Sequence, residues 1–204
     1  MGLANRKMEG YGVVVSFREY PRIHMQVPLW LYLKYSSTPK QKGYGLIAGF
    51  DVNSDRLNAV VIDNDGDIIV MKTFWYSEAV SHGFPREKAK WVRLNALSGA
   101  LKWCRRIGVD YVVFEDLARI KTRKYASNPS VNRKITKFPK KQMLEHGVVK
   151  ALKQGFTVIL INPRGTSNSL THKQVMREEG LDKHMASAYI IAYRGLKIIR
   201  NHKK

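Results

Sequence analysis

The sequence has one cysteine, Cys104, among its 204 residues. A single cysteine cannot form a disulfide within the chain, and no Cys-x-x-Cys pair is present to hold zinc. Cys104 follows Leu94, Leu97 and Leu101 at spacings of three and four, which places it on the apolar side of a predicted helix. We therefore interpret Cys104 as a small core residue and not as a nucleophile.

Long apolar runs are also lacking, since the longest are too short to span a bilayer. The first residues, MGLANRKMEGYG, contain no apolar stretch of the signal-peptide kind. Arg6 stands where an N-myristoylation motif has serine or threonine. These absences predict a cytoplasmic protein with no membrane partner.

Acidic residues are few, with 16 Asp and Glu against 36 Lys and Arg, so the formal net charge is +20. Such an excess predicts a polyanionic partner, with nucleic acid first and an anionic membrane surface second. The alternative is a basic protein without such a partner. A hydrophobic content of 44% is enough to bury a core, which argues against global disorder.

The pattern changes near residue 43. Residues 1–42 hold two strand-like runs, at 11–17 and 27–35, followed by a stretch rich in Ser, Pro, Lys and Gly that is typical of a linker. So short a segment buries little core. We predict a short β-rich N-terminal segment with a linker over 1–42, and one larger domain over 43–204 with a basic insertion at 118–141.

The larger domain alternates strand and helix patterns. A turn at 64–67, Asn-Asp-Gly-Asp, predicts a hairpin; a calcium loop is disfavoured because the glycine spacing is not that of an EF-hand. A polar connector is expected at 163–180. Strands are expected at 45–52, 57–63, 68–76, 110–114 and 156–162, the last two of them buried, and helices at 85–107, 140–155 and 181–199.

This order of elements predicts a ribonuclease H-like (RuvC-like) α/β fold. Short turns make the first three strands antiparallel neighbours, and helical crossovers make the later strands parallel to the first. The result is a mixed five-stranded sheet flanked by helices, with the first and fourth strands side by side. Asp51 on the first strand and Glu115 at the end of the fourth would then face each other, and the last helix would bring Asp182 to the same edge.

Clustered carboxylates are the ligands that divalent Mg²⁺ prefers. Two such ions about 3.5–4 Å apart activate water and stabilise the leaving oxygen in phosphodiester cleavage. Taken singly, each of these acids is weak evidence, because an acid after a strand is often only a turn or cap residue. The three together, at matching positions in a matching element order, predict a nuclease site that uses Mg²⁺ or Mn²⁺.

Residues 118–141 carry nine basic side chains and no acid. Tyr125 and Phe138 are interspersed and could stack on bases. We predict an arm along a phosphate backbone; the alternative is a solvated loop without a partner. The predicted contacts are Arg119, Lys121, Arg123, Lys124, Arg133, Lys134, Lys137, Lys140 and Lys141.

Four segments resemble the transposon-encoded OrfB/TnpB proteins, relatives of the type V CRISPR nucleases. GFDVNSDRLNAVVIDNDG resembles their first RuvC-like motif, VVFEDL the second, VILINPRGTS the strand and turn before their zinc ribbon, and LDKHMASAYIIAYRGL the third. The resemblance covers residues 45–199. It implies RNA-guided, Mg²⁺-dependent DNA cleavage by Asp51, Glu115 and an acid of the third motif.

Three features depart from that family. The stretch after PRGTS has no cysteine, at most about 42 residues precede the nuclease-like region, and the third motif reads Asp182-Lys183-His184. Asp182 is either a metal ligand or a helix N-cap, and His184 is a candidate ligand or base. His172 has no such argument and is expected at the surface.

Three functions remain open. The first is a metal-dependent DNA endonuclease of the transposase-associated type, whose partners would be DNA and a guide RNA or a DNA–RNA hybrid. The second is a catalytically impaired nucleic-acid-binding protein derived from such a nuclease. The third and weakest is a Holliday-junction resolvase.

Overall fold

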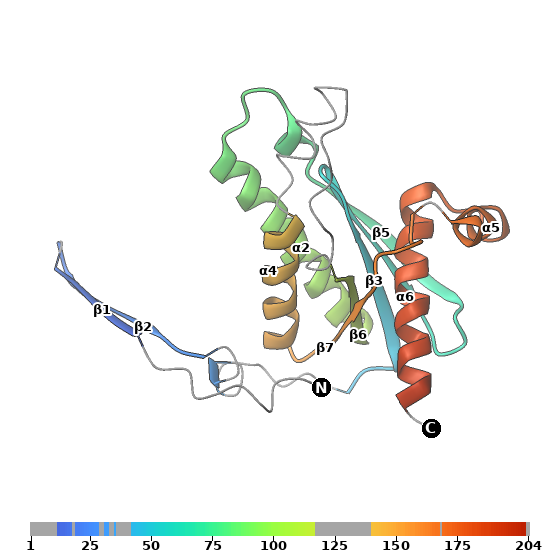
Figure 1. Ribbon diagram of the computed structural model, residues 1–204, viewed down its shortest axis with the longest axis horizontal. Helices are drawn as coiled ribbons and strands as arrows, with labels where there is room; N and C mark the ends of the chain where they lie inside the picture. The colour runs from blue at the N-terminus through green and yellow to red at the C-terminus, as the bar shows by residue number, and fades with distance from the viewer. Residues whose placement is uncertain are drawn as a thin grey trace.

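The computed structural model describes residues 12–17, 19–28, 31–32, 35, 42–116, 140–167 and 169–202. Its main sheet has five strands in the order β5-β4-β3-β6-β7 (Figure 1). The pairings β3–β4 and β4–β5 are antiparallel, whereas β3–β6 and β6–β7 are parallel. The strands are β3 (Leu46–Val52), β4 (Arg56–Ile62), β5 (Ile68–Trp75), β6 (Val109–Glu115) and β7 (Thr157–Ile161). This confirms the predicted ribonuclease H-like sheet.

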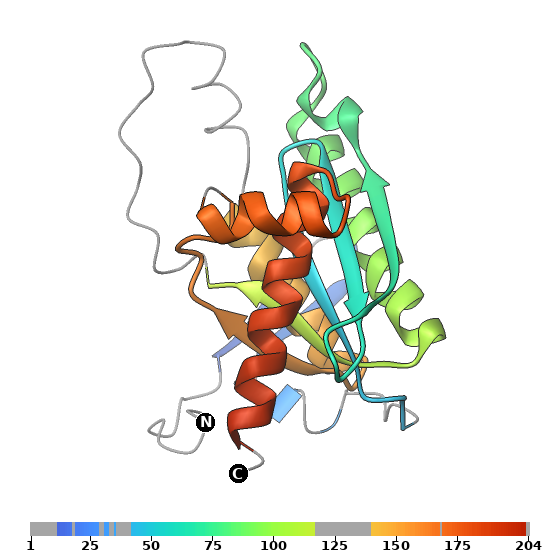
Figure 2. The same ribbon diagram turned by 90° about the vertical axis from the view of Figure 1, so that its right-hand side faces the viewer.

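Helices cover both faces of this sheet (Figures 1 and 2). One core cluster joins the sheet to α2 (Arg86–Ile107) and α4 (Lys140–Lys153), and it includes the fully buried Cys104. A second cluster joins the other face to α6 (Lys183–His202). The apolar residues predicted to face inward on this last helix are buried: Met185, Ala188, Ile191, Ala192 and Leu196. Among the described residues, no helix has both the length and the apolarity to cross a membrane.

Two glycines bring α6 directly onto the central strands. A Cβ atom on Gly49 of β3 would lie 2.2 Å from the carbonyl oxygen of Ala188, and one on Gly195 of α6 would lie 2.4 Å from a methyl carbon of Val113 on β6. Backbones can approach this closely only where no side chain intervenes. The axis of α6 is thereby fixed across β3 and β6, and its first turn is held at the end of these strands where Asp51 and Glu115 lie.

The turn between β4 and β5 forms as predicted. Asp63 Oδ1 accepts hydrogen bonds from the backbone N–H groups of Asp65, Gly66 and Asp67 at 2.8, 2.9 and 3.0 Å. Gly66 has φ of 103°, a conformation that favours glycine. The Asp side chain is thus occupied in shaping a hairpin turn.

The N-terminal hairpin differs from the prediction. β1 (Gly12–Phe17) pairs antiparallel with β2 (Pro21–Gln26), in the register Phe17↔Pro21. The prediction of a second strand at 27–35 was wrong, because residues 31, 32 and 35 are helical. Pairing across the short connection between Phe17 and Pro21 closes a small loop, and Pro21 is tolerated because it is the first residue of its strand.

Two features of the C-terminal half were also predicted wrongly. The connector at 163–180 contains a helix, α5 (Leu170–Glu178), which begins where the Ser169 hydroxyl accepts a hydrogen bond from the backbone N–H of His172 at 3.1 Å. The strand expected to be buried, β7, is an edge strand whose Leu160 is 45% exposed. An apolar run alone does not distinguish an edge strand from a central one.

Candidate active site

Asp51 and Glu115 end neighbouring parallel strands. Gly49 pairs with Val113 in the register of β3 and β6. One residue further, the rings of Phe50 and Phe114 stack with their centroids 5.0 Å apart. Asp51 and Glu115 come next on the two strands, so the adjacency predicted from the element order is what the fold provides.

The Asp51 carboxylate is buried and engaged. Its side chain has two polar neighbours at Oδ2: the Asn53 side-chain amide donates a hydrogen bond at 2.7 Å, and His184 Nδ1 lies at 3.2 Å. Asp51 is only 7% exposed. A carboxylate so placed is held in one orientation by a neutral donor from its own turn and by an imidazole from α6.

His184 is the residue of the third motif that reaches Asp51. Its hydrogen bond to Asp51 raises the pKa of the imidazole, which outweighs the opposing effect of partial burial. When Nδ1 carries a proton, it donates to Asp51 at 3.2 Å, and the contact is an ion pair only when both ring nitrogens are protonated. His184 is therefore the hydrogen-bond partner of Asp51, as a neutral or a cationic imidazole.

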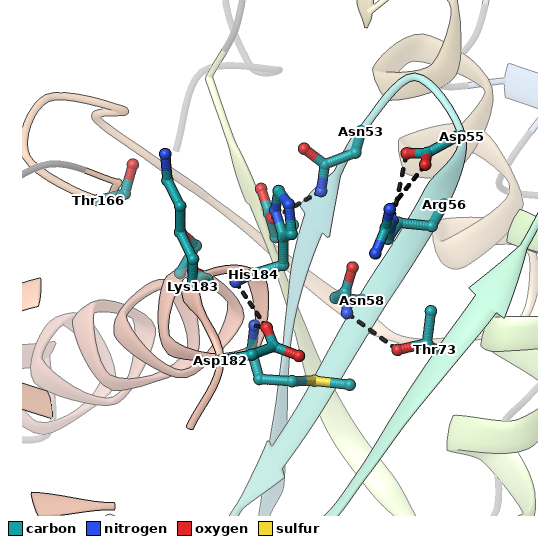
Figure 3. Close-up of polar contacts among 12 residues, drawn as sticks. Asn53, Asp55, Arg56, Asn58, Thr73, Thr166, Asp182, Lys183 and His184 are labelled. Carbon is teal, nitrogen blue, oxygen red and sulfur yellow. Dashed lines mark hydrogen bonds and ion pairs between the residues drawn. The ribbon is translucent and has the colours of Figure 1, made fainter. Parts of the chain in front are cut away.

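Asp182 caps the helix that carries His184. Its Oδ1 accepts hydrogen bonds from the backbone N–H groups of His184 at 2.8 Å and Met185 at 2.9 Å (Figure 3). These are N–H groups that the first turn of a helix leaves unpaired. Of the two open interpretations of Asp182, this arrangement is that of the N-cap, and it orients the turn from which His184 extends.

Glu115 is supported by the turn that follows β7. The Thr166 hydroxyl donates to Glu115 Oε1, and the carbonyl oxygen of Pro163 lies 2.9 Å from the same hydroxyl. Thr166 is 1% exposed. The sequence NPRGTS after β7 thus supplies a buried hydroxyl beside the second acid, a role that its polar composition alone does not reveal.

The donor chemistry fits a divalent cation only in part. Asp51 and Glu115 supply oxygen ligands of the kind that Mg²⁺ prefers, from adjacent strands. Within the described residues, however, no group of three Asp, Glu, His or Cys side chains is arranged so that it could hold a metal ion. In this arrangement Asp51 contacts His184 and Asp182 caps the helix, and the choice of a third ligand between Asp182 and His184 stays a prediction.

Arg56 is a cation near these acids that sequence reasoning missed. Its guanidinium donates to both carboxylate oxygens of Asp55, at 3.2 and 2.7 Å. The hydrogen bond to Asp55 raises the Arg56 pKa most, and the charges of Asp182 and Asp51 raise it further. Only the pairing of β3 with β4 through a tight turn brings this arginine to the acids.

That tight turn is clamped from the core. The Tyr76 hydroxyl lies 2.9 Å from the carbonyl oxygen of Asn53 and 2.7 Å from that of Arg56, and burial raises the Tyr76 pKa. Arg93 of α2 donates to the carbonyl oxygen of Ser54 at 3.3 Å. The clamp holds Asn53, and with it the orientation of Asp51.

His172 is buried, contrary to the surface position expected from the sequence. It is 2% exposed, and its Nε2 lies 3.0 Å from the carbonyl oxygen of Lys183 and 3.2 Å from the hydroxyl of Ser187. A carbonyl oxygen only accepts, so Nε2 carries the proton. His172 thus joins α5 to the first turn of α6. The spacing of His172, Val175 and Met176 along α5 was the signal that could have revealed this buried side.

The predicted nucleic-acid contacts cannot be compared with the fold. Arg119, Lys121, Arg123, Lys124, Arg133, Lys134 and Lys137 lie outside the described residues, and so do Tyr125 and Phe138. Lys140 and Lys141 belong to the first turn of α4, but their side chains are outside the description as well. Their role stays a prediction.

Sequence comparison finds longer relatives. Residues 1–37 match the family described as the SSO2105 N-terminal domain. The uncharacterized protein SSO2105 of Saccharolobus solfataricus is 61% identical over 201 residues, which are 98% of this chain and 54% of that protein. An uncharacterized protein of Aeropyrum pernix is 30% identical over 182 residues, which are 85% of this chain and 48% of that protein. The chain thus spans about half the length of the curated relatives it matches.

Solved structures with a similar arrangement include Thermus thermophilus RuvC and a Cas12f1 complex. Thermus thermophilus RuvC is 17% identical, with 72% of this chain and 90% of that chain covered and a TM-score of 0.47. The Cas12f1 chain of a complex with sgRNA and target DNA is 12% identical, with 89% of this chain and 44% of that chain covered and a TM-score of 0.48.

Proposed function

We propose that this chain is a metal-dependent endonuclease that hydrolyses phosphodiester bonds in DNA. The observation that carries the proposal is the convergence of Asp51, Glu115 and His184 at one end of β3, β6 and α6. The motif resemblance to the OrfB/TnpB proteins supports it, and so does the net charge of +20, which suits a polyanionic substrate. Pairing with a guide RNA, or action on a DNA–RNA hybrid, belongs to the same proposal.

In this proposal Asp51 and Glu115 hold Mg²⁺ or Mn²⁺, with Asp182 or His184 as a further ligand. A bound ion would supply an activated water and stabilise the leaving oxygen. The protein's own part is to present both carboxylates from rigid central strands. If the His184 side chain turns away, Asp51 becomes free to bind metal. If His184 stays in contact, it would accept or donate a proton as a general base or acid.

The test is cleavage of supercoiled plasmid and single-stranded DNA with Mg²⁺ or Mn²⁺. Asp51→Asn and Glu115→Gln keep the size of each side chain but remove its charge, and each should abolish cleavage. Glu87→Gln, on the exposed first turn of α2, is the matched control and should cleave like the unchanged protein. Cleavage that survives Asp51→Asn would refute the assignment.

A second candidate function is nucleic-acid binding without cleavage. It is favoured by the arrangement in which Asp51 contacts Asn53 and His184, Asp182 caps α6, and the described part of the chain holds no three-donor group for a metal. It predicts tight binding that weakens steeply with salt. It also predicts no metal-dependent cutting in the same assays, in which case Asp51→Asn would leave binding unchanged.

A further inference from the structure

Trp75 is a large aromatic side chain left exposed at the active-site end of the sheet. It is the last residue of β5 and is 59% exposed. It pairs across the strands with Arg56, the first residue of β4. Burying an indole is favourable in folding, so an indole left in water at this place is available to a partner.

One face of the Trp75 ring is already occupied. The guanidinium carbon of Arg56 lies 4.1 Å from the ring centroid, a cation–π contact. Arg56 is itself held by the two hydrogen bonds to Asp55 (Figure 3). Arg56 therefore orders the indole through one face of the ring, while Trp75 as a whole stays 59% exposed. A ring ordered in advance loses little entropy when a second ring stacks on it.

The place of Trp75 relative to the acids follows from the strand register. Asp51 pairs with Asn58, and Asn58 with Thr73, so these three lie on the same face of the sheet. Trp75 is two residues beyond Thr73 on that face, towards the end where β3 and β6 finish. With strands about 4.8 Å apart, β5 lies about 10 Å from β3.

We propose that Trp75 is a stacking platform for an unpaired nucleobase of a single-stranded segment next to the candidate active site. This rests on the nucleic-acid substrate proposed above. Every base has a π-face, so such stacking tolerates any sequence. Bases within a duplex are already stacked, which limits the platform to single strands or flipped bases.

A nucleic acid is favoured over a protein as the occupant. The net charge of +20 suits an anionic partner. Ile69 and Met71 of β5 are exposed as well, at 52% and 46%. A protein partner would cover these two residues together with Trp75, whereas a stacked base needs only the indole.

Binding of a short fluorescent single-stranded oligonucleotide, measured without metal, tests the platform. Trp75→Ala should weaken binding about tenfold, which corresponds to the loss of one base stack of roughly 1.4 kcal/mol. Trp75→Phe keeps an aromatic face and should bind within about threefold of the unchanged protein. Trp91→Ala is the matched control and should change nothing, since Trp91 is 66% exposed on α2, across the sheet.

Two further measurements make the result specific. The slope of log affinity against log salt should be the same for Trp75→Ala and the unchanged protein, because no phosphate contact is lost. Thermal unfolding should show that Trp75→Ala and Trp75→Phe are folded. If Trp75→Ala binds like the unchanged protein, or if Phe weakens binding as much as Ala, the platform is refuted, and a protein contact over Ile69, Met71 and Trp75 becomes the better explanation.

The outcome is independent of cleavage. A protein that binds single strands through Trp75 but never cuts DNA would refute the nuclease proposal and leave the platform standing. If the protein cuts DNA but Trp75→Ala leaves single-strand binding unchanged, the nuclease proposal stands and the platform is refuted. Absence of any single-strand binding by the unchanged protein would refute the platform.

Discussion

His184 Nδ1 lies 3.2 Å from Asp51 Oδ2, so the first turn of α6 reaches the carboxyl end of β3. The two residues are 133 positions apart in the sequence. The contact depends on α6 lying close on β3 at Gly49, and on Asp182 capping the turn from which His184 extends. Each of these supports can be tested separately.

The pKa of His184 should be above its ordinary value of 6.5 in the metal-free protein, because its hydrogen bond to Asp51 favours the protonated form. Asp51→Asn should bring the pKa back down. NMR titration of the imidazole measures both. A His184 pKa at or below 6.5 in the unchanged protein, or one indifferent to Asp51→Asn, would contradict the ion pair.

The same pKa shift predicts how stability depends on pH. A folded-state pKa above the unfolded one means that His184 stabilises the fold fully below about pH 6.5, and that this contribution is lost as pH rises through the folded pKa. His184→Gln does not titrate and should therefore be less stable than the unchanged protein only at low pH. Urea unfolding on the acid and alkaline sides of this range measures the difference.

Asp182 and His184 should affect cleavage unequally. Asp182→Ser keeps a good N-cap and should preserve both stability and activity, while Asp182→Ala should lower stability by about 1 kcal/mol. His184→Ala removes the side chain that contacts Asp51, and we expect it to reduce cleavage strongly. Single-turnover cleavage and urea unfolding separate the two effects. Loss of cleavage in a stable Asp182→Ser variant would instead make Asp182 the ligand.

His172→Ala should lower stability by roughly 1–3 kcal/mol, because it removes a buried donor and leaves a cavity between α5 and α6. His172→Gln can still place an N–H near the carbonyl oxygen of Lys183 and should recover part of the loss. Lys173→Ala, the exposed neighbour on α5, is the control. Unfolding midpoints in urea measure all three, and an unchanged midpoint for His172→Ala would refute the link between α5 and α6.

Gly49→Ala should be severely destabilising, since the new Cβ would stand 2.2 Å from the carbonyl oxygen of Ala188 and 2.4 Å from the amide nitrogen of Ala192. Overpacking of this kind costs about 1–3 kcal/mol or more. Gly99→Ala in α2 meets nothing within 4 Å and should be neutral, or stabilising by up to about 1 kcal/mol. Thermal unfolding of the pair measures the contrast. Equal stability of the two variants would show that α6 can shift away from β3.

The sequence by itself determined the five strands of the main sheet, the helices α2, α4 and α6, and the order of these elements. Burial of one face leaves a period of about 3.6 in α2 and α6, and full burial leaves an apolar run in β3 and β6. Short turns and helical crossovers then restrict the strand order. Asp51 and Glu115 could be found in this way, because each ends a strand whose place in the sheet follows from that order.

Tertiary structure alone decided which side chains meet across elements. Asp182 and His184 were equal candidates in the sequence, and only the packing of α6 on β3 turned the imidazole towards Asp51 while the carboxylate capped the helix. The burial of His172 and the stacking of Arg56 on Trp75 were decided in the same way. Local patterns record how much of a segment is buried, whereas contacts between distant segments depend on the register and close approach of backbones, which no local pattern encodes.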